Sequence, residues 1–445
     1  MRMSRKIGYG LGDLGISISY FAVGFFFMYY LTDIVGMTPI LAGTAVLIGK
    51  LWDGINDPLI GVLSDKTRSR FGRKGIYILF GTIPFAVSFV LLWMIPPAAD
   101  QWKQFALATA SILLFATTYS LVAVPYMALV PVITADYDER TQVTGIRAIL
   151  STIGTILGGG VALFLSAYSD MALGLRTMAI GFAIVIMICL FAAYYSVRGV
   201  ERRGEVAPAV ANIKLAQYLV LPKERNVLIL LVFKFLGAIA TGCLIASIPY
   251  FTKNILGSTG SSSFGVGIYT AASAALVPVW NKLTHVFDKR RLLLIANSLG
   301  AIVLVFIGLF IHEGYVLVFF LGCGLLGAVT SAYLLIPYSL VPDLVDYYRH
   351  KTRERHESVF FGLWMTVHQL GIAVAGFLLG VLLNIGAYDG TASVQPGSAL
   401  LAVRLAFGLV PGLFLVVAAL VLQKYGITRK VYQGIRADLE KPASS

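Results

Sequence analysis

The stretch KLWDGINDPLIGVLSDKTRSRFGRK, residues 50 to 74, decides the fold predicted for this chain. It begins inside an apolar segment, residues 38 to 63, that exceeds the roughly 20 residues with which a helix crosses a bilayer. On a helix, Lys50, Asp53 and Asp57 fall within an arc of about 60° and share one face, with Asn56 beside them. A charge at bilayer depth costs about 2.5 to 3.5 kcal/mol, so this face is expected to meet a polar cavity or a bound cation.

The composition is that of a membrane protein. The 445 residues are 58% hydrophobic and 13% charged, with a mean hydropathy of +0.82, whereas soluble domains carry about 25% charged residues. The net charge of +13 does not indicate nucleic-acid binding, because the basic residues lie in short turns between apolar segments. MRMSRK leads directly into a long apolar segment, so no signal peptide is expected. The three cysteines lie in apolar segments without disulfide, metal or redox spacing.

Hydropathy and charge together predict an all-α polytopic protein with twelve transmembrane helices. Placing the N-terminus inside puts 28 of the 35 Lys and Arg residues in cytoplasmic segments and four in outward turns. This bias predicts cytoplasmic termini and an inner (plasma) membrane location, and we expect a functional monomer. The predicted spans are residues 9–31, 38–63, 75–96, 104–133, 144–168, 174–197, 226–252, 264–284, 292–311, 315–342, 358–385 and 399–423.

A long polar interruption, residues 198–225, divides the predicted spans into bundles of six at 1–197 and 226–445. Each half carries a similar passage, VPYMALVPVITADYDER at 124–140 and IPYSLVPDLVDYYRHKTRER at 336–355. Such duplication is typical of carriers that hold substrate between two bundles near the midplane. Prolines in these passages are candidate hinges, and GTILGGG at 154–160 has the small-residue spacing that lets membrane helices approach closely.

The chain resembles the glycoside-pentoside-hexuronide:cation symporters, the melibiose permease group of the major facilitator superfamily. The resemblance covers nearly the whole chain and rests on several motifs together: YGLGD, MYYLTDIVG, KLWDGINDPLIG with TRSRFGRK, VPYMALVP with DERTQVTGIR, LVPDLVDY and ESVFFG. It implies the major facilitator fold and secondary active transport by alternating access.

The resemblance assigns the cation site to Asp53, Asn56 and Asp57 of the second span, completed by the Ser120 hydroxyl. The residues support this independently, because a hard cation such as sodium prefers oxygen ligands, whereas two close carboxylates also favour binding a proton. Lys50 would neutralise the carboxylates when no cation is bound. The other interpretation is a structural intramembrane ion pair. No cofactor is expected besides the coupling ion, Na⁺ or H⁺, and no other metal.

The predicted substrate site differs from that of melibiose-transporting members. Their two sugar-binding carboxylates correspond to Ser17 and Ala123 here, so melibiose itself is not expected to be the solute. Asp13, one turn before Ser17, is either a substitute sugar ligand or a cap on a helix at the membrane edge. The full set of predicted substrate residues is Asp13, Ser17, Tyr20, Tyr119, Arg147, Trp364, His368 and Gln369.

Charged residues at the cytoplasmic ends of both bundles are predicted to balance charge and to latch one conformational state. They are Asp65, Arg68, Arg73, Arg140, Asp343 and Asp346, together with Lys50 inside the membrane. The predicted function is cation-coupled symport of a sugar, glycoside or related small polar solute. The alternatives are a proton-coupled exporter of amphiphiles or drugs and a lysolipid carrier, with an intramembrane protease, suggested by GLGD at 10–13, the most remote.

Overall fold

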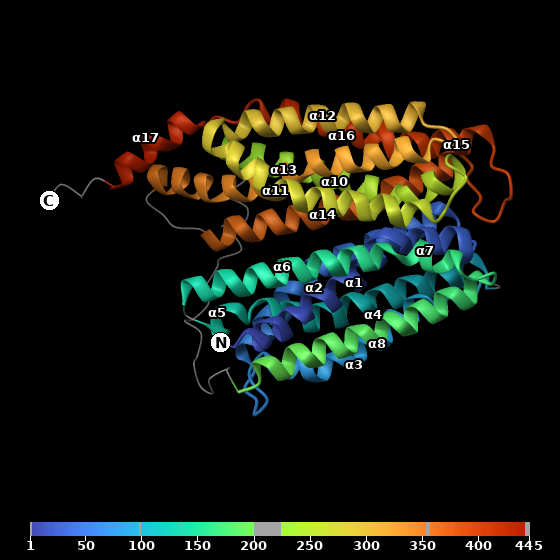
Figure 1. Ribbon diagram of the computed structural model, residues 1–445, viewed down its shortest axis with the longest axis horizontal. Coiled ribbons are helices and arrows are strands. Elements are labelled where there is room, and N and C mark those ends of the chain that lie inside the picture. The colour runs from blue at the N-terminus through green and yellow to red at the C-terminus, as the bar shows by residue number, and fades with distance from the viewer. Residues whose placement is uncertain (1, 98, 135, 200–223, 353–356, 441–445) are drawn as a thin grey trace. The chain divides into compact units, whose positions relative to one another are not determined.

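A computed structural model describes residues 2–97, 99–134, 136–199, 224–352 and 357–440, and within these ranges the chain forms helices and no strand (Figure 1). Eleven of these helical segments are long and apolar enough to cross a membrane. The remaining long helix, α2 (Pro39–Lys66), carries the three charges around which the prediction was built. The all-α polytopic fold class is therefore confirmed.

The helices of the first half follow the predicted spans, with starts that differ by up to seven residues, at α6. Their bounds are α1 Met3–Tyr29 with the π-turn η1 Tyr30–Ile34, α2 Pro39–Lys66, α3 Gly75–Leu92, α4 Gln101–Met127, α5 Val130–Ile133, α6 Tyr137–Gly159, α7 Val161–Ser166 and α8 Met171–Val197. The predicted fourth span is broken after Met127, and Pro131 then lies in the first turn of α5, where its missing N–H costs no helical hydrogen bond. Of the predicted linker, residues 200–223 lie outside the described residues.

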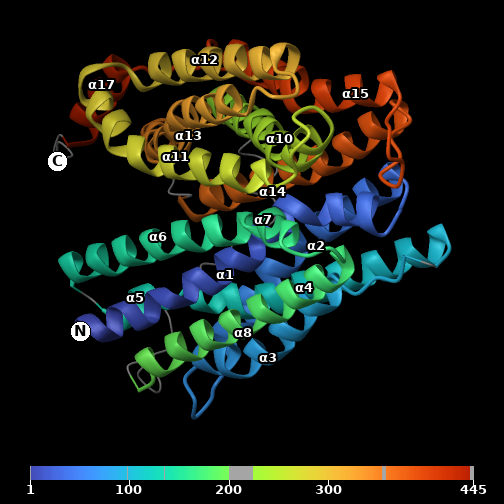
Figure 2. The same cartoon turned by 45° about the vertical axis from the view of Figure 1, so that its right-hand side comes forward.

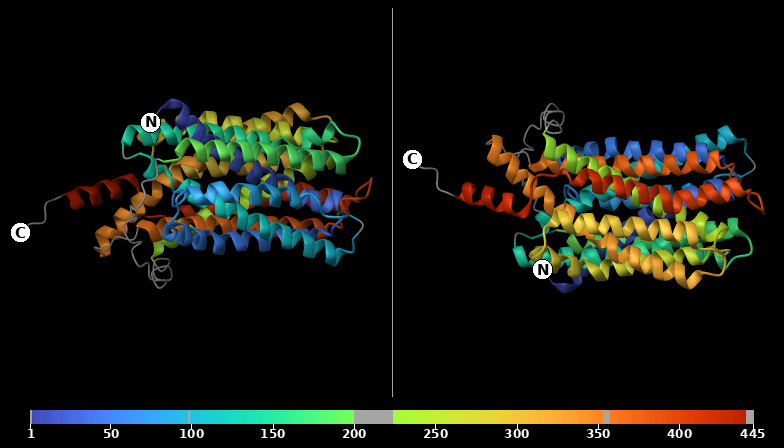
Figure 3. Two further views of the ribbon diagram at one scale, coloured as in Figure 1. Left: turned by 90° about the horizontal axis from the view of Figure 1, so that it is seen from below. Right: turned by 90° about the horizontal axis from the view of Figure 1, so that it is seen from above.

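The second half contains α10 Arg225–Asn254, α11 Ser261–Val286, α12 Lys289–Phe310, α13 Val316–Thr352, α14 Glu357–Ile385, α15 Gly397–Arg404, η3 Leu405–Leu409, α16 Val410–Leu422 and α17 Arg429–Glu440. Helix α13 runs ten residues past its predicted end at 342, because Pro337 and Pro342 do not terminate it. Helix α17, which was not predicted, extends beyond α12 and α16 of its own unit (Figure 3).

By packing, the chain forms two compact units that do not follow the sequence halves throughout. The first comprises Met1–Pro208, Ile245–Thr270 and Gly376–Val403, and the second comprises Ala209–Leu244, Ala271–Ala375 and Arg404–Ser445. The first unit thus includes the ends of α10 and α14 that lead into their following loops. The division at 198–225 into two six-helix bundles stays a prediction.

Glycines permit the closest helix contacts in the first unit, where α1 packs against α6 and α8 (Figure 2). A Cβ atom built on Gly154 would lie 2.5 Å from the Leu14 carbonyl oxygen, and one on Gly158 would lie 2.6 Å from that of Ile18. The predicted close approach at GTILGGG is therefore confirmed, and its partner is α1. Glycine is required there because any side chain would meet backbone.

In the second unit, α12 packs against α13 and α16. Gly308 and Gly408 face each other so closely that an added Cβ on either would lie 2.7 Å from the other's Cα. A hydrophobic core of aromatic and aliphatic residues in the same unit includes the buried residues Phe233, Ile336 and Trp364.

Candidate functional site

The carboxylates of α2 are held against α4 in the first unit. The Ser120 hydroxyl, on α4, donates to Asp57 Oδ1 at 2.5 Å. Asp53 is 7% exposed and Asn56 5% exposed, and the Asn56 Nδ2 has no acceptor among the described residues. Since Asp53 and Asp57 are one turn apart, the structure places all four predicted cation-site residues together.

Pro58 lies inside α2, directly after Asp57. It has no N–H, so the carbonyl of Gly54, four residues earlier, lacks its helical donor. This carbonyl belongs to the residue that follows Asp53, and it is left as a backbone acceptor within α2. The prediction from sequence did not include it, although the WDGINDP motif contains both residues.

Lys50 supplies the counter-charge to this cluster. Its Nζ lies 3.0 Å from Asp53 Oδ2, and both side chains are largely buried. The same ammonium lies 4.5 Å from the centroid of the Tyr20 ring on α1, and the rings of Tyr20 and Tyr119 are 5.5 Å apart. The predicted substrate residues Tyr20 and Tyr119 therefore border the cation cluster.

Asp13 lies within α1 and forms a buried ion pair with Arg147 of α6. Arg147 Nε donates to Asp13 Oδ2 at 2.5 Å and Nη2 to Oδ1 at 3.2 Å, and the Tyr126 hydroxyl donates to Oδ2 at 2.7 Å. The helix-cap interpretation of Asp13 is wrong, because α1 begins at Met3 and Asp13 lies in its interior. One turn further along α1, the Ser17 hydroxyl is 2.7 Å from that of Ser151.

The remaining predicted substrate residues lie on α14 in the second unit. Trp364 is 1% exposed and packs edge-on against Tyr338, with the ring centroids 5.9 Å apart. His368 and Gln369 are half-buried on the next turn, and the buried Gln369 Oε1 has no donor among the described residues. These three residues thus belong to the second unit, whereas the other five predicted substrate residues belong to the first.

Sequence reasoning missed Lys234, the residue against which Trp364 packs. This lysine lies on α10, is 2% exposed, and has its Nζ 5.0 Å from the Trp364 ring centroid. The only indication in the sequence is that Lys234 is a charged residue inside an otherwise apolar predicted span.

Four of the predicted latch residues, Asp65, Arg140, Asp343 and Asp346, have partners within their own unit. Asp65 pairs with Lys74 at 3.3 Å, and Asp343 pairs with Lys289 at 2.6 Å within the second unit. Arg140 Nε donates to the Thr134 carbonyl, and Asp346 accepts a hydrogen bond from the Tyr432 hydroxyl. Arg68 and Arg73 lie in the turn between α2 and α3. A latch joining Asp343 or Asp346 to those arginines stays a prediction.

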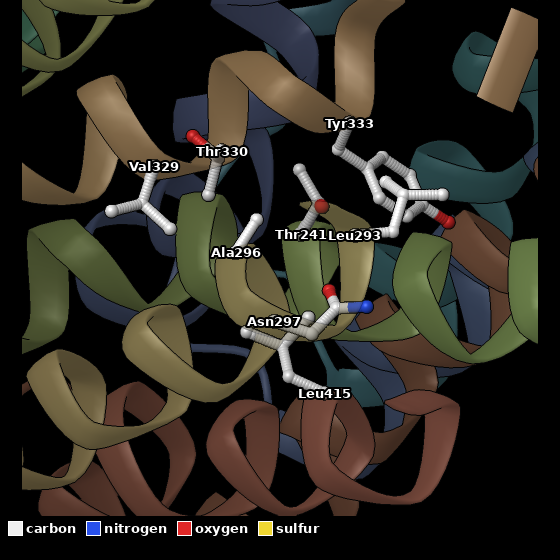
Figure 4. A pocket seen from close by; sticks show the side chains of 8 residues that line it. All are labelled: Thr241, Leu293, Ala296, Asn297, Val329, Thr330, Tyr333 and Leu415. Atoms are coloured by element: carbon white, nitrogen blue, oxygen red, sulfur yellow. The ribbon is translucent and has the colours of Figure 1, made fainter. Parts of the chain in front are cut away.

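A small cavity lies within the second unit between α10, α12, α13 and α16 (Figure 4). Its polar lining residues are Thr241, Asn297, Thr330 and Tyr333. The Thr241 and Thr330 hydroxyls donate to carbonyls of their own helices, whereas the Asn297 Nδ2 has no acceptor in the described part of the chain. None of these residues belongs to the predicted site.

Eleven helices of membrane-spanning length in the described part of the chain, together with the buried cluster of acids, amide and hydroxyl on α2 and α4, are the features of a secondary transporter. The family model described as MFS/sugar transport protein matches residues 8–429. The chain therefore belongs to this family of membrane transporters of small molecules. It is not an enzyme, and the protease alternative is set aside.

Known relatives are similar along nearly their whole length. The uncharacterized symporter sll1374 of Synechocystis is 28% identical over 99% of this chain and 97% of its own. The putative glycoside/cation symporter YagG of Escherichia coli is 26% identical over 99% of this chain and 95% of its own. The inward-open xylose transporter XylE of E. coli has a TM-score of 0.69 at 13% identity, covering 97% of this chain and 98% of that one, which confirms the fold.

Proposed function

We propose that the protein couples the uptake of a sugar, glycoside or related small polar solute to a cation, Na⁺ or H⁺, in the inner (plasma) membrane. The observation that carries the proposal is the cluster of Asp53, Asn56, Asp57 and Ser120, in which oxygen ligands converge inside a membrane helix bundle. The relative named a glycoside/cation symporter supports both the solute class and the coupling.

The cluster has the chemistry that coupling requires. Sodium prefers oxygen ligands, and the two carboxylates, the amide and the Ser120 hydroxyl provide them without a nitrogen or sulfur donor. The Asn56 amide has no described acceptor on its nitrogen, so it is free to turn its oxygen toward an ion. A proton is the alternative occupant, because two neighbouring carboxylates repel each other when both are charged.

The carboxylates can be neutralised either by the Lys50 ammonium or by a bound cation. In the present state the Lys50 ammonium occupies one oxygen of Asp53 at 3.0 Å. A cation that binds both carboxylates competes with this ammonium, and a displaced Lys50 remains beside the Tyr20 ring. Cation binding is thereby linked to Tyr20 and Tyr119, the predicted substrate residues, and reciprocal coupling of cation and solute affinity follows from such a link.

The test uses the purified full-length protein in proteoliposomes, with a panel of glycosides, pentoses and sugar acids and with a sodium or proton gradient in turn. We expect the wild type to accumulate a member of the panel against its gradient with one of the two cations. Asp53→Asn and Asp57→Asn are expected to lose this accumulation while retaining solute exchange without a gradient. Asp100→Asn is the matched control, because Asp100 is an exposed helix cap and asparagine caps equally well.

Full accumulation by both variants of α2 would overturn the coupling assignment. A response to amphiphiles, with none to any sugar, would instead support the exporter or lysolipid alternatives.

A further inference from the structure

Lys234 is a buried ammonium enclosed by three aromatic rings in the second unit. Its Nζ lies 4.9 Å from the ring centroid of Tyr333, 5.1 Å from that of Tyr338 and 5.0 Å from that of Trp364. Among the described residues, no carboxylate or other acceptor pairs with this nitrogen. We call Lys234 and these three rings the lysine cage.

The rings alone do not account for a charge at this position. Aromatic faces attract a cation, but they carry no opposite charge and accept no strong hydrogen bond. An intramembrane lysine is ordinarily paired with an acid or with backbone carbonyls. The ammonium therefore retains three donors with no described acceptor, and an anion entering the cage would provide the missing counter-charge.

The cage is built by specific backbone features. Gly237 makes room for Tyr333, because a Cβ atom at that position would lie 2.0 Å from the Tyr333 hydroxyl oxygen. That hydroxyl donates to the Lys234 carbonyl at 3.1 Å, which fixes one wall of the cage against α10.

The opposite wall has the means to open. Pro337 and Pro342 have no N–H, so the carbonyls four residues earlier, those of Tyr333 and Tyr338, lack their helical donors. Helix α13 is therefore weakened at the two residues that contribute its rings. Tyr338 is 36% exposed, whereas Trp364 is 1% exposed, so the Tyr338 ring is the more accessible wall of the cage.

We propose that the lysine cage is a subsite for a carboxylate group on the transported solute, which makes a sugar acid or uronoside the substrate class. A single ammonium suits a monoanion, whereas a phosphate dianion is ordinarily met by more than one cationic group or by a helix terminus. Tyr338, which is 36% exposed, offers a ring face for the sugar. This inference rests on the proposed function, since it specifies the solute of that carrier.

The test is ligand binding by the purified full-length protein in detergent, followed by thermal unfolding in sodium chloride without any gradient. The probes are pairs that differ in one carboxylate: glucuronate and glucose, galacturonate and galactose, and methyl β-glucuronide and its methyl ester. We expect a saturable stabilisation by at least one carboxylated member and an affinity at least tenfold lower for its neutral partner. Lys234→Gln is expected to remove this preference, and Lys234→Arg to retain it. Lys103→Gln, which changes an exposed lysine, is the control.

Equal stabilisation by both members of every pair, or none by any carboxylated probe, would overturn the proposal, as would an unchanged preference in a folded Lys234→Gln variant. If that variant does not fold, the wild-type comparison of methyl β-glucuronide with its ester still decides. Cation-driven accumulation of a neutral solute would support the proposed function but contradict the lysine cage as a carboxylate subsite. Carboxylate binding without cation-driven uptake would support the subsite but contradict the proposed coupling.

Discussion

The Asp33 carboxylate lies 2.5 Å from the Lys253 ammonium, and its side chain is 1% exposed. Asp33 belongs to the π-turn that ends the first span, and Lys253 to the last turn of α10. The Tyr388 hydroxyl, from the loop after α14, also donates to Asp33, at 2.7 Å. Residues 220 and 355 positions away from Asp33 thus converge on one buried acid within the first unit. The contact therefore joins three distant segments of the first unit through a single buried carboxylate.

We predict that Lys253→Met destabilises the protein by about 3 to 5 kcal/mol, because it leaves a buried carboxylate without its counter-charge. The double variant with Asp33→Asn is expected to be more stable than Lys253→Met alone, since the remaining charge is then removed. Thermal unfolding of the two single variants and the double variant gives the coupling energy. Single-variant effects that simply add would contradict this prediction, and the exposed pair of Lys103 and Asp100 provides a reference cycle.

A second prediction concerns the contact between α1 and α6. Gly158→Ala is expected to lower the free energy of unfolding by about 1 to 3 kcal/mol, because the added Cβ would lie 2.6 Å from a backbone carbonyl that has no room to move. Gly145→Ala, on the same helix, is the matched control, since a Cβ there meets nothing within 4 Å. Alanine is expected to be neutral or stabilising at that position. Unfolding of both variants in the same detergent is the measurement, and equal effects would contradict the assigned contact.

The sequence predicted the helices well because membrane spans are set by length and hydropathy, which are local properties. It also placed Asp53, Asn56 and Asp57 together, since helical periodicity fixes which residues of α2 share a face. Asp13 was left with two interpretations because its partner, Arg147, is 134 positions away. No periodicity within α1 identifies that partner, and the packing of α1 on α6 decides it.

Lys234 shows the same limit more sharply. Composition marks it as unusual in an apolar span, but the rings that enclose it come from α13 and α14, about 100 to 130 positions further along the chain. The prolines at 337 and 342 were predicted to be hinges, yet helix α13 continues through both. The sequence alone identifies the carbonyls that the prolines leave without donors, because each lies four residues before a proline. That these carbonyls belong to cage residues is apparent only once the rings are placed.

The ion pair of Asp13 and Arg147 gives a third prediction. Arg147→Lys is expected to cost about 1 to 3 kcal/mol of stability, because an ammonium cannot reproduce the two-point contact of the guanidinium with Asp13. Arg147→Gln is expected to cost more, since it leaves the carboxylate of Asp13 buried without a cation. The order of the two variants in thermal unfolding is the readout. Arg68→Lys, in the turn after α2, is the control, and a lysine variant as unstable as the glutamine variant would contradict the account.

The last prediction tests whether the Ser120 hydroxyl, which donates to Asp57, is a cation ligand or only a structural group. Ser120→Ala removes an oxygen that lies 2.5 Å from the carboxylate, and a hydrogen bond to a charged group contributes about 1.5 to 3 kcal/mol. We therefore expect the concentration of coupling cation that gives half-maximal uptake to rise about tenfold or more, with the maximal rate changing little. Ser111→Ala is the matched control on α4, because the Ser111 hydroxyl donates only to a carbonyl of its own helix. Uptake measured against cation concentration in proteoliposomes decides, and an unchanged cation dependence in a stably folded Ser120→Ala variant would remove this hydroxyl from the site.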